Sequence, residues 1–230
     1  MRRLLIALLC YSIPAIAQTK TPAQKTHRQA AINTVLKRQL DSIMILDQQY
    51  RLIVETILET SDTHYKDSIA AVLKIAPDKV TDQLMKQQTI VDSVNMVFID
   101  GVLKKYGYPG KALVDTPTNE VAFYVIQHSK FIGKYIDLVK QAGKNKQLDF
   151  TLVAMMEDRY LMNNGKEQIY GTQGMRRPLK NGGIDSFIWP IKDPAHVNAR
   201  RRKAGFQLTV EQNADRLGIK YKVVTLAEVQ

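Results

Sequence analysis

The stretch MEDRYLMNNGKEQIYGTQ occupies residues 156–173 and marks the point where the pattern of the chain changes. Before it, apolar residues recur at the three- and four-residue steps of helices, and after it short alternating runs favour strands. Within it, the pair Asp158-Arg159 comes at an expected helix end, and Asn163-Asn164-Gly165 is typical of a helix stop. The polar run Gln168–Gln173 that follows favours a strand.

Upstream of this stretch the sequence predicts helices. The expected ranges are about 30–59, a short turn at 69–75, a long helix from Pro77 to about Lys105, a helical run from Thr116 to about Gly143 and a helix over about 149–162. Thr116-Pro117 is a typical helix start, and Gly107 followed by Pro109 is a typical stop. The pattern leaves open whether 116–143 is one kinked helix or two.

Downstream, we expect a small β-hairpin made of strands 168–173 and 187–191, with turn residues at Asn181-Gly182-Gly183. Asp193-Pro194 predicts a further helix that ends at Gly205. Thr209 and Gln212 have the spacing of a capping box for a last short helix. The predicted fold is therefore mainly α, an irregular bundle of four or five helices with a short hairpin in the C-terminal third.

The first residues predict an export signal. Arg2 and Arg3 precede an apolar run from Leu4 to Ile13 that is too short to span a bilayer, and Ala15-Ile16-Ala17 matches a cleavage site. We expect a signal peptide (1–17), a flexible leader (18–29), a single mainly helical domain (30–206) and a basic C-terminal extension (207–230). The mature protein would then be secreted or periplasmic, without a transmembrane segment.

The composition is that of a soluble globular protein, with 45% hydrophobic and 24% charged residues in a chain of 230. The formal net charge of +11 favours anionic ligands in general, while the expected export argues against a nucleic-acid partner. Cys10 is the only cysteine and lies in the expected signal peptide. The mature chain would therefore lack disulfides, thiol nucleophiles and thiolate metal sites.

Several polar motifs occur in a fixed order along the chain. They are Asp47-Gln48 with Arg51, Asp92 with Asn95, Gln127-His128, Asp158-Arg159, Gln168-x-Tyr170-Gly171-Thr172-Gln173, Trp189-Pro190-Ile191-x-Asp193 and Arg200-Arg201. This order, over roughly Leu46 to Phe206, resembles the bacterial domain-of-unknown-function family 6624. The resemblance brings no activity with it, but it implies that these residues belong to one shared site.

The chemistry of these residues suggests roles in such a site. His128 lies in an apolar helical context and is the candidate general acid or base, with Asp158 as its orienting partner. An alternative of equal weight is that Asp158 forms an ion pair with Arg159 or Arg201 at the helix end. The candidate ligand-binding residues are Gln127, Arg159, Gln168, Tyr170, Thr172, Gln173 and Arg201. Of the adjacent Arg200 and Arg201, at most one is expected to face the site.

Three functions remain open at this point. The leading hypothesis is a polar pocket that binds a small polar or anionic ligand. The alternatives are a hydrolase that uses His128, and a structural domain in which the same residues form a buried polar network. No cofactor is expected, and no metal site is predicted, because the histidines lack metal-ligand spacing. A carboxylate site that uses Asp47 and Asp92 is conceivable, but no motif in the sequence supports it. Phosphate-binding loops and serine-nucleophile motifs are absent from the sequence.

Overall fold

The computed structural model of the chain describes residues 31–60, 63–179 and 182–229. The expected signal peptide and leader, and Asn181 of the expected turn, lie outside the described residues. Within them the mainly α fold with a C-terminal two-stranded hairpin is confirmed. None of the described helices is long and apolar enough to cross a membrane.

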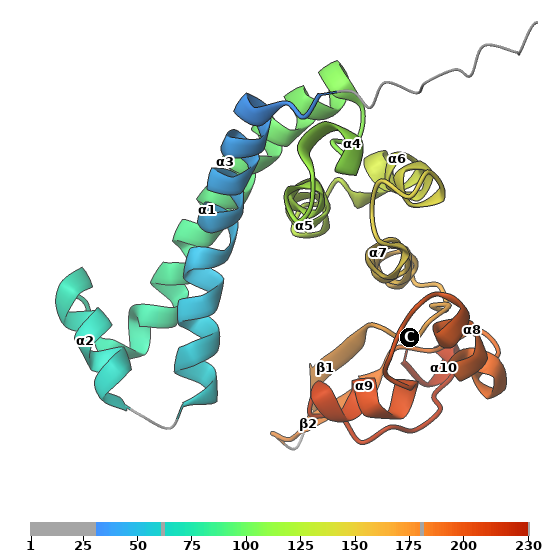
Figure 1. Cartoon of the computed structure of the whole chain (residues 1–230). Helices are drawn as coiled ribbons and strands as arrows, with labels where there is room; N and C mark the ends of the chain where they lie inside the picture. The colour runs from blue at the N-terminus through green and yellow to red at the C-terminus, as the bar shows by residue number, and fades with distance from the viewer. Residues whose placement is uncertain (1–30, 61–62, 180–181, 230) are drawn as a thin grey trace, which may run out of the picture.

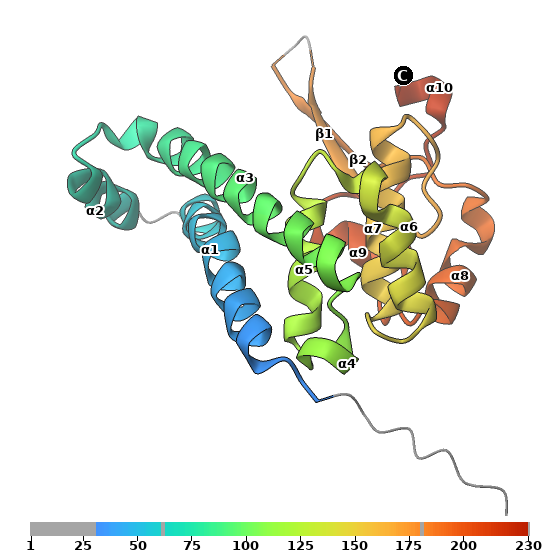
Figure 2. The same cartoon turned by 90° about the horizontal axis from the view of Figure 1, so that it is seen from above.

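Two long helices form an arm that projects from the rest of the molecule (Figures 1 and 2). Helices α1 (Thr34–Glu59) and α3 (Val80–Tyr106) lie side by side, and α2 (Thr63–Leu73) covers their far end, followed by the 3-10 turn η1 (Pro77–Lys79). A small apolar cluster of Val54, Ala70, Val80 and Leu84 holds this end together. The near end of the arm carries Leu36, Leu40 and Ile99 into the main core. The arm is therefore anchored at one end and extends freely from it.

The main core is completed by shorter helices that follow the arm. These are α4 (Lys111–Val114), the 3-10 turn η2 (Thr118–Glu120), α5 (Val121–Gln127), α6 (Ile132–Lys144) and α7 (Phe150–Asn163). The run from Thr116 to Gly143 thus contains two separate helices. Ser129 separates them, because its hydroxyl donates to the Ile126 carbonyl and accepts the Phe131 N–H. Asp149 caps α7 by accepting the Thr151 N–H, as expected for an N-cap aspartate.

The C-terminal part contains the hairpin and a third apolar cluster. Strands β1 (Gly174–Pro178) and β2 (Ile184–Ile188) are antiparallel, with Gly174 opposite Ile188. The 3-10 turn η3 (Pro194–His196), α8 (Val197–Lys203), α9 (Val210–Arg216) and α10 (Leu226–Val229) follow. Val210, Ala214 and Ile219 pack with Ile188, Ile191 and Val197. Residues after Phe206, which the sequence sets apart as an extension, thus contribute to this cluster.

The first strand of the hairpin was predicted at the wrong residues, whereas the expected second strand overlaps β2 at Phe187 and Ile188. The segment Gln168–Gln173 is irregular apart from a parallel bridge between Gln168 and Ile191, and β1 begins only at Gly174. The physical reason is that the N–H groups of 169, 170 and 172 donate to a buried carboxylate instead of to a strand. The helix start at Thr209 is confirmed, because Thr209 and Gln212 form both bonds of the capping box.

Candidate functional site

Asp158, one turn before the end of α7, is fully buried and organises the loop that follows. Its Oδ1 accepts the N–H groups of Ile169 at 2.7 Å and Tyr170 at 3.0 Å. Its Oδ2 accepts the N–H and the hydroxyl of Thr172, both at 3.0 Å. Four donors on one carboxylate leave few lone pairs free, so Asp158 mainly positions the backbone of the loop.

Gln168 fixes the other side of the same loop. It is fully buried, its Oε1 accepts the Gln173 N–H at 2.9 Å, and its Nε2 donates to the carbonyls of Gln173 and Trp189. Gly171, at φ +67°, lies so close to its neighbours that a Cβ there would come within 2.7 Å of Val210. The loop therefore needs glycine at this position.

Arg201 closes the loop from α8. It is 2% exposed, donates to the carbonyls of Leu208 and Tyr170 at 2.8 Å each, and has its guanidinium 4.6 Å from the centre of the Phe206 ring. Arg200 also binds backbone, through the carbonyls of Ile169, Lys192 and Asp193. Both arginines thus hold chain segments together. We call the set Asp158, Gln168, Thr172, Gln173 and Arg201 the Asp158 network.

Burial and hydrogen bonding have opposite effects on the pKa of the Asp158 carboxyl. Burial raises the pKa of the Asp158 carboxyl, while the bonds from Thr172, Tyr170 and Ile169 act to lower it. Burial likewise lowers the pKa of Arg201, and the charge of Asp158 opposes that change. The two buried groups therefore stabilise each other's charged forms.

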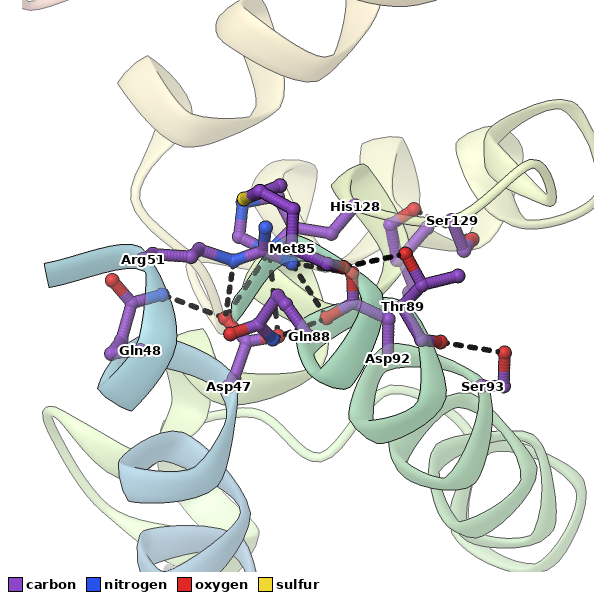
Figure 3. Close-up of polar contacts among 11 residues, drawn as sticks. Asp47, Gln48, Arg51, Met85, Gln88, Thr89, Asp92, Ser93, His128 and Ser129 are labelled. Atoms are coloured by element: carbon purple, nitrogen blue, oxygen red, sulfur yellow. Dashed lines mark hydrogen bonds and ion pairs between the residues drawn. The ribbon is translucent and has the colours of Figure 1, made fainter. Parts of the chain in front are cut away.

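A second polar network lies where the arm meets α5, and we call it the Asp47 network (Figure 3). It joins Asp47 and Arg51 of α1, Gln88 and Asp92 of α3, and His128, the C-cap of α5. The Asp47 carboxylate is fully buried and lies 3.1 Å from Nδ1 of His128. Gln48 donates to the same carboxylate at 2.6 Å. A buried carboxylate thus holds the imidazole in place.

The remaining contacts of the Asp47 network involve Asp92. Arg51 donates from Nη2 to both Asp92 oxygens, at 2.6 and 2.7 Å, and Gln88 donates from Nε2 at 2.7 Å. Nε of Arg51 is 3.8 Å from Asp47, beyond hydrogen-bond distance. Oxygen and nitrogen atoms of Asp47, Asp92 and His128 lie within 4.8 Å of one another, close enough together to hold a metal ion.

This network is incompletely paired, unlike the first. Nε of Arg51 and Oε1 of Gln88 are buried and have no hydrogen-bond partner among the described residues. Nε of the half-buried Arg159 is in the same condition. Burial lowers the pKa of Arg159, and the nearby charge of Arg51 lowers it further. The guanidinium groups of Arg51 and Arg159 therefore repel each other, and neither has a hydrogen-bond acceptor for its Nε among the described residues.

A cavity of about 680 Å³ opens beside the Asp47 network. It lies between α3 and the connection from α5 to α6, and Met96, Val97, Phe131 and Tyr135 supply apolar parts of its wall. Its polar lining includes Thr89, Asp92, Ser93, His128, Ser129 and Lys130. The cavity has the size and mixed lining of a site for a small molecule.

The predicted site residues divide between these two networks. Among the described residues the hydrogen-bond partner of the His128 ring is Asp47, not Asp158 as expected from the sequence. Asp158, Gln168, Thr172, Gln173 and Arg201 form the other network, and the Tyr170 ring packs against Phe150 and Phe206. Arg159 lies near Arg51 of the Asp47 network. Gln127 is partly buried at the last residue of α5.

The single shared site implied by the motif order is therefore two groups of contacts, and no hydrogen bond between described residues joins them. Gln88 was missed by the sequence analysis. The available signal was its spacing of one helical turn before Asp92, which places both side chains on one face of α3.

The comparisons with known proteins agree with the resemblance seen in the sequence. The model of a family of unknown function, DUF6624, matches residues 27–222. Searches of the curated proteins and of the solved structures found no match.

Proposed function

The chain belongs to the family of unknown function DUF6624, and from its geometry we propose that it binds a small polar or anionic ligand in the cavity beside the Asp47 network. The observation that carries the proposal is the placement of His128. Its ring lines the cavity, and its Nδ1 is held by the buried Asp47. Nε2 then remains as the ring nitrogen that can meet a ligand, because it has no partner among the described residues.

The charges around this cavity favour a ligand with a negative group. Both carboxylates on the cavity wall are already paired, Asp92 with Arg51 and Asp100 with two lysines. Lys130 on the same wall has no carboxylate partner among the described residues, and Arg159 beside Arg51 also lacks one. An anion near these groups would relieve the repulsion between the two guanidinium groups and supply acceptors for their free N–H groups.

The proposal is tested by NMR on the chain without its first 17 residues, with the histidine side chains labelled. Inorganic phosphate, citrate and glucose serve as probes, in buffer containing EDTA. We expect phosphate or citrate to shift the His128 resonances and to leave those of His196 unchanged, because His196 is exposed and bound to Asp193. His128→Ala should abolish the binding, and His196→Ala should preserve it. Binding that survives His128→Ala, or no binding by any probe, contradicts the proposal.

A second candidate function, acid–base catalysis, is favoured by one contact. Asp47 holds Nδ1 of His128 in the manner of a carboxylate that orients a catalytic imidazole, leaving Nε2 to exchange protons with a substrate. In this proposal Asp47, rather than Asp158, is the residue that orients the His128 ring. Hydrolysis of nitrophenyl esters and phosphates by the wild type, lost in both His128→Ala and Asp47→Asn, would support catalysis. Turnover that is unaffected by either change would rule it out.

We also propose that the protein is exported with removal of residues 1–17. The support is the sequence alone: two arginines, a short apolar run and an A-x-A motif. Intact-mass measurement of the protein from its native host tests this. A mature chain that starts near Gln18 supports export, and a retained Met1 or an added lipid mass contradicts it.

A further inference from the structure

Three metal-binding side chains from distant parts of the sequence meet in the Asp47 network. Asp47 comes from α1, Asp92 from α3 and His128 from the end of α5, and their ligand atoms lie within 4.8 Å of one another. Two carboxylates and one imidazole are a donor set used for divalent transition metals. A gathering of such residues is by itself insufficient, because carboxylates also gather around arginines, as Asp92 does here with Arg51.

A fourth side chain supplies an independent indication. Gln88 is fully buried, and its amide adjoins the cluster because Nε2 donates to Oδ1 of Asp92 at 2.7 Å. Its Oε1 is buried and has no hydrogen-bond partner among the described residues. A buried amide oxygen without a donor is costly, and a cation held by Asp92 would give this amide oxygen an electropositive partner.

We infer that Asp47, Asp92, His128 and Gln88 form a binding site for a divalent transition-metal ion, with Arg51 as the cation that occupies its place when the metal is absent. The inference goes beyond ligand binding in the cavity and is tested without any organic ligand. Arg51 neutralises Asp92, and its Nε lies 3.8 Å from Asp47. Entry of a metal requires Arg51 to release Asp92.

The distances fit this exchange. Metal–ligand bonds of roughly 2.0–2.2 Å keep opposite ligand atoms no more than about 4.4 Å apart. The ligand atoms of Asp47, Asp92 and His128 lie within 4.8 Å of one another, so closure of these three around an ion needs movements of only about half an ångström. Side-chain rotations of Asp92 and Gln88 on the helix surface are sufficient for such a change, whereas Asp47 is fully buried and already fixed by Gln48.

The donor set indicates which ions are preferred. Imidazole suits zinc, iron and nickel, and carboxylate and amide oxygens suit manganese and magnesium, so the mixed set favours Mn²⁺, Fe²⁺ or Zn²⁺ over Ca²⁺ and Mg²⁺. With a metal bound, His128 is a ligand through Nδ1, so this nitrogen no longer bonds Asp47. The metal also lies beside the cavity, since Asp92 and His128 both line it. An anionic ligand in the cavity would then meet a metal ion as well as Lys130.

The experiment is calorimetric titration of the metal-stripped chain, lacking its first 17 residues, with Mn²⁺ and with Zn²⁺. We expect one ion per chain and, for Zn²⁺, a shift of the His128 ring resonances. Asp92→Asn should weaken binding by about tenfold or more. Asp100→Asn is the matched control: Asp100 also lies on α3 and on the cavity wall but outside the cluster, and its change should leave the affinity unchanged.

Arg51→Gln supplies a second variant that a general loss of folding cannot imitate. Removing the competing cation should strengthen metal binding while the circular dichroism spectrum stays helical. The inference is overturned if the wild type binds neither ion, if Asp92→Asn and Asp100→Asn weaken binding equally, or if Arg51→Gln weakens it. Phosphate and citrate binding are measured in EDTA, so the metal site can fail while the proposed ligand binding stands, and the reverse also holds.

Discussion

The two polar networks contain the same kinds of side chain but differ in how completely they are paired. In the Asp158 network one buried carboxylate accepts four hydrogen bonds. Arg201 and Gln168 donate hydrogen bonds to backbone carbonyls. In the Asp47 network buried atoms of Arg51 and Gln88 have no partner among the described residues, and the network borders a cavity. Complete pairing is what a structural role requires, and the proposed ligand binding rests on the incomplete pairing beside the cavity.

The adjacent residues Asp158 and Arg159 show how one helix serves both networks. Successive residues of a helix point about 100° apart, so Asp158 turns to the C-terminal loop while Arg159 turns to Arg51. Helix α7 therefore forms a physical connection between the completely paired network and the network that borders the cavity. The free energy of unfolding of variants in each network tests this division.

The largest effect is expected for Asp158→Ala. The change leaves three backbone N–H groups and the Thr172 hydroxyl without their acceptor and Arg201 without its nearby charge. We expect the free energy of unfolding to fall by about 3–5 kcal/mol, measured by urea denaturation. Asp215→Ala, at an exposed aspartate, is the control and should change it by less than about 0.5 kcal/mol. A similarly small effect of Asp158→Ala would mean that the loop does not depend on its carboxylate.

The second effect concerns Arg201→Lys. Lysine keeps the charge but cannot reproduce the two-pronged contact with the Leu208 and Tyr170 carbonyls or the stacking on Phe206. We expect a loss of about 2–3 kcal/mol in the free energy of unfolding, again from urea denaturation. The neighbouring Arg202 is exposed, so Arg202→Lys is a closely matched control that should have no measurable effect. Equal effects at both positions would contradict the structural role of Arg201.

In the Asp47 network, removing a charged side chain should raise the free energy of unfolding rather than lower it. Arg159 is a half-buried cation beside Arg51 with a buried, unpaired Nε, so Arg159→Met should raise the free energy of unfolding by about 1 kcal/mol. The same change should weaken phosphate or citrate binding. Arg159→Lys keeps the charge and should give no such gain. If Arg159→Met destabilises the protein instead, its guanidinium makes a structural contribution and the contrast between the networks is lost.

Some of these features could be predicted from the sequence, and others could not. The long helices, the capping box at Thr209 and the stop at Gly107 depend on local chemistry, and the structure contains them. The motif order brought out Asp47, Arg51, Asp92 and His128, but it could not show which motif meets which. Those pairings depend on how α1, α3 and α5 pack, over separations of 41 and 81 residues.

The first strand of the hairpin was misplaced for the same reason, a contact with a residue outside the local pattern. Gln168–Gln173 has the composition of a strand, and its backbone N–H groups would suit a sheet if nothing else competed for them. Asp158 competes successfully, because a buried carboxylate attracts N–H donors more strongly than a neutral carbonyl does. A local pattern contains no information about a carboxylate that reaches the segment from a preceding helix.

The smallest effect tests whether the two networks unfold together. Asp149 caps α7, the helix that carries both Asp158 and Arg159, and the N–H and hydroxyl of Thr151 lower its pKa. Because the folded-state pKa is depressed, the stabilisation is present above the unfolded value near pH 4 and is lost as the pH falls through the folded value. Asp149 is exposed, so solvent limits the effect of Asp149→Ala to about 0.5–1 kcal/mol at pH 7. The difference from the wild type should shrink below about pH 4.

Hydrogen exchange of the Asp149→Ala variant tests the coupling between the two networks. If α7 couples them, exchange should rise together for amides in the loop after α7 and at the end of α5. Exchange that rises in only one of these segments would show that the networks are two independent units.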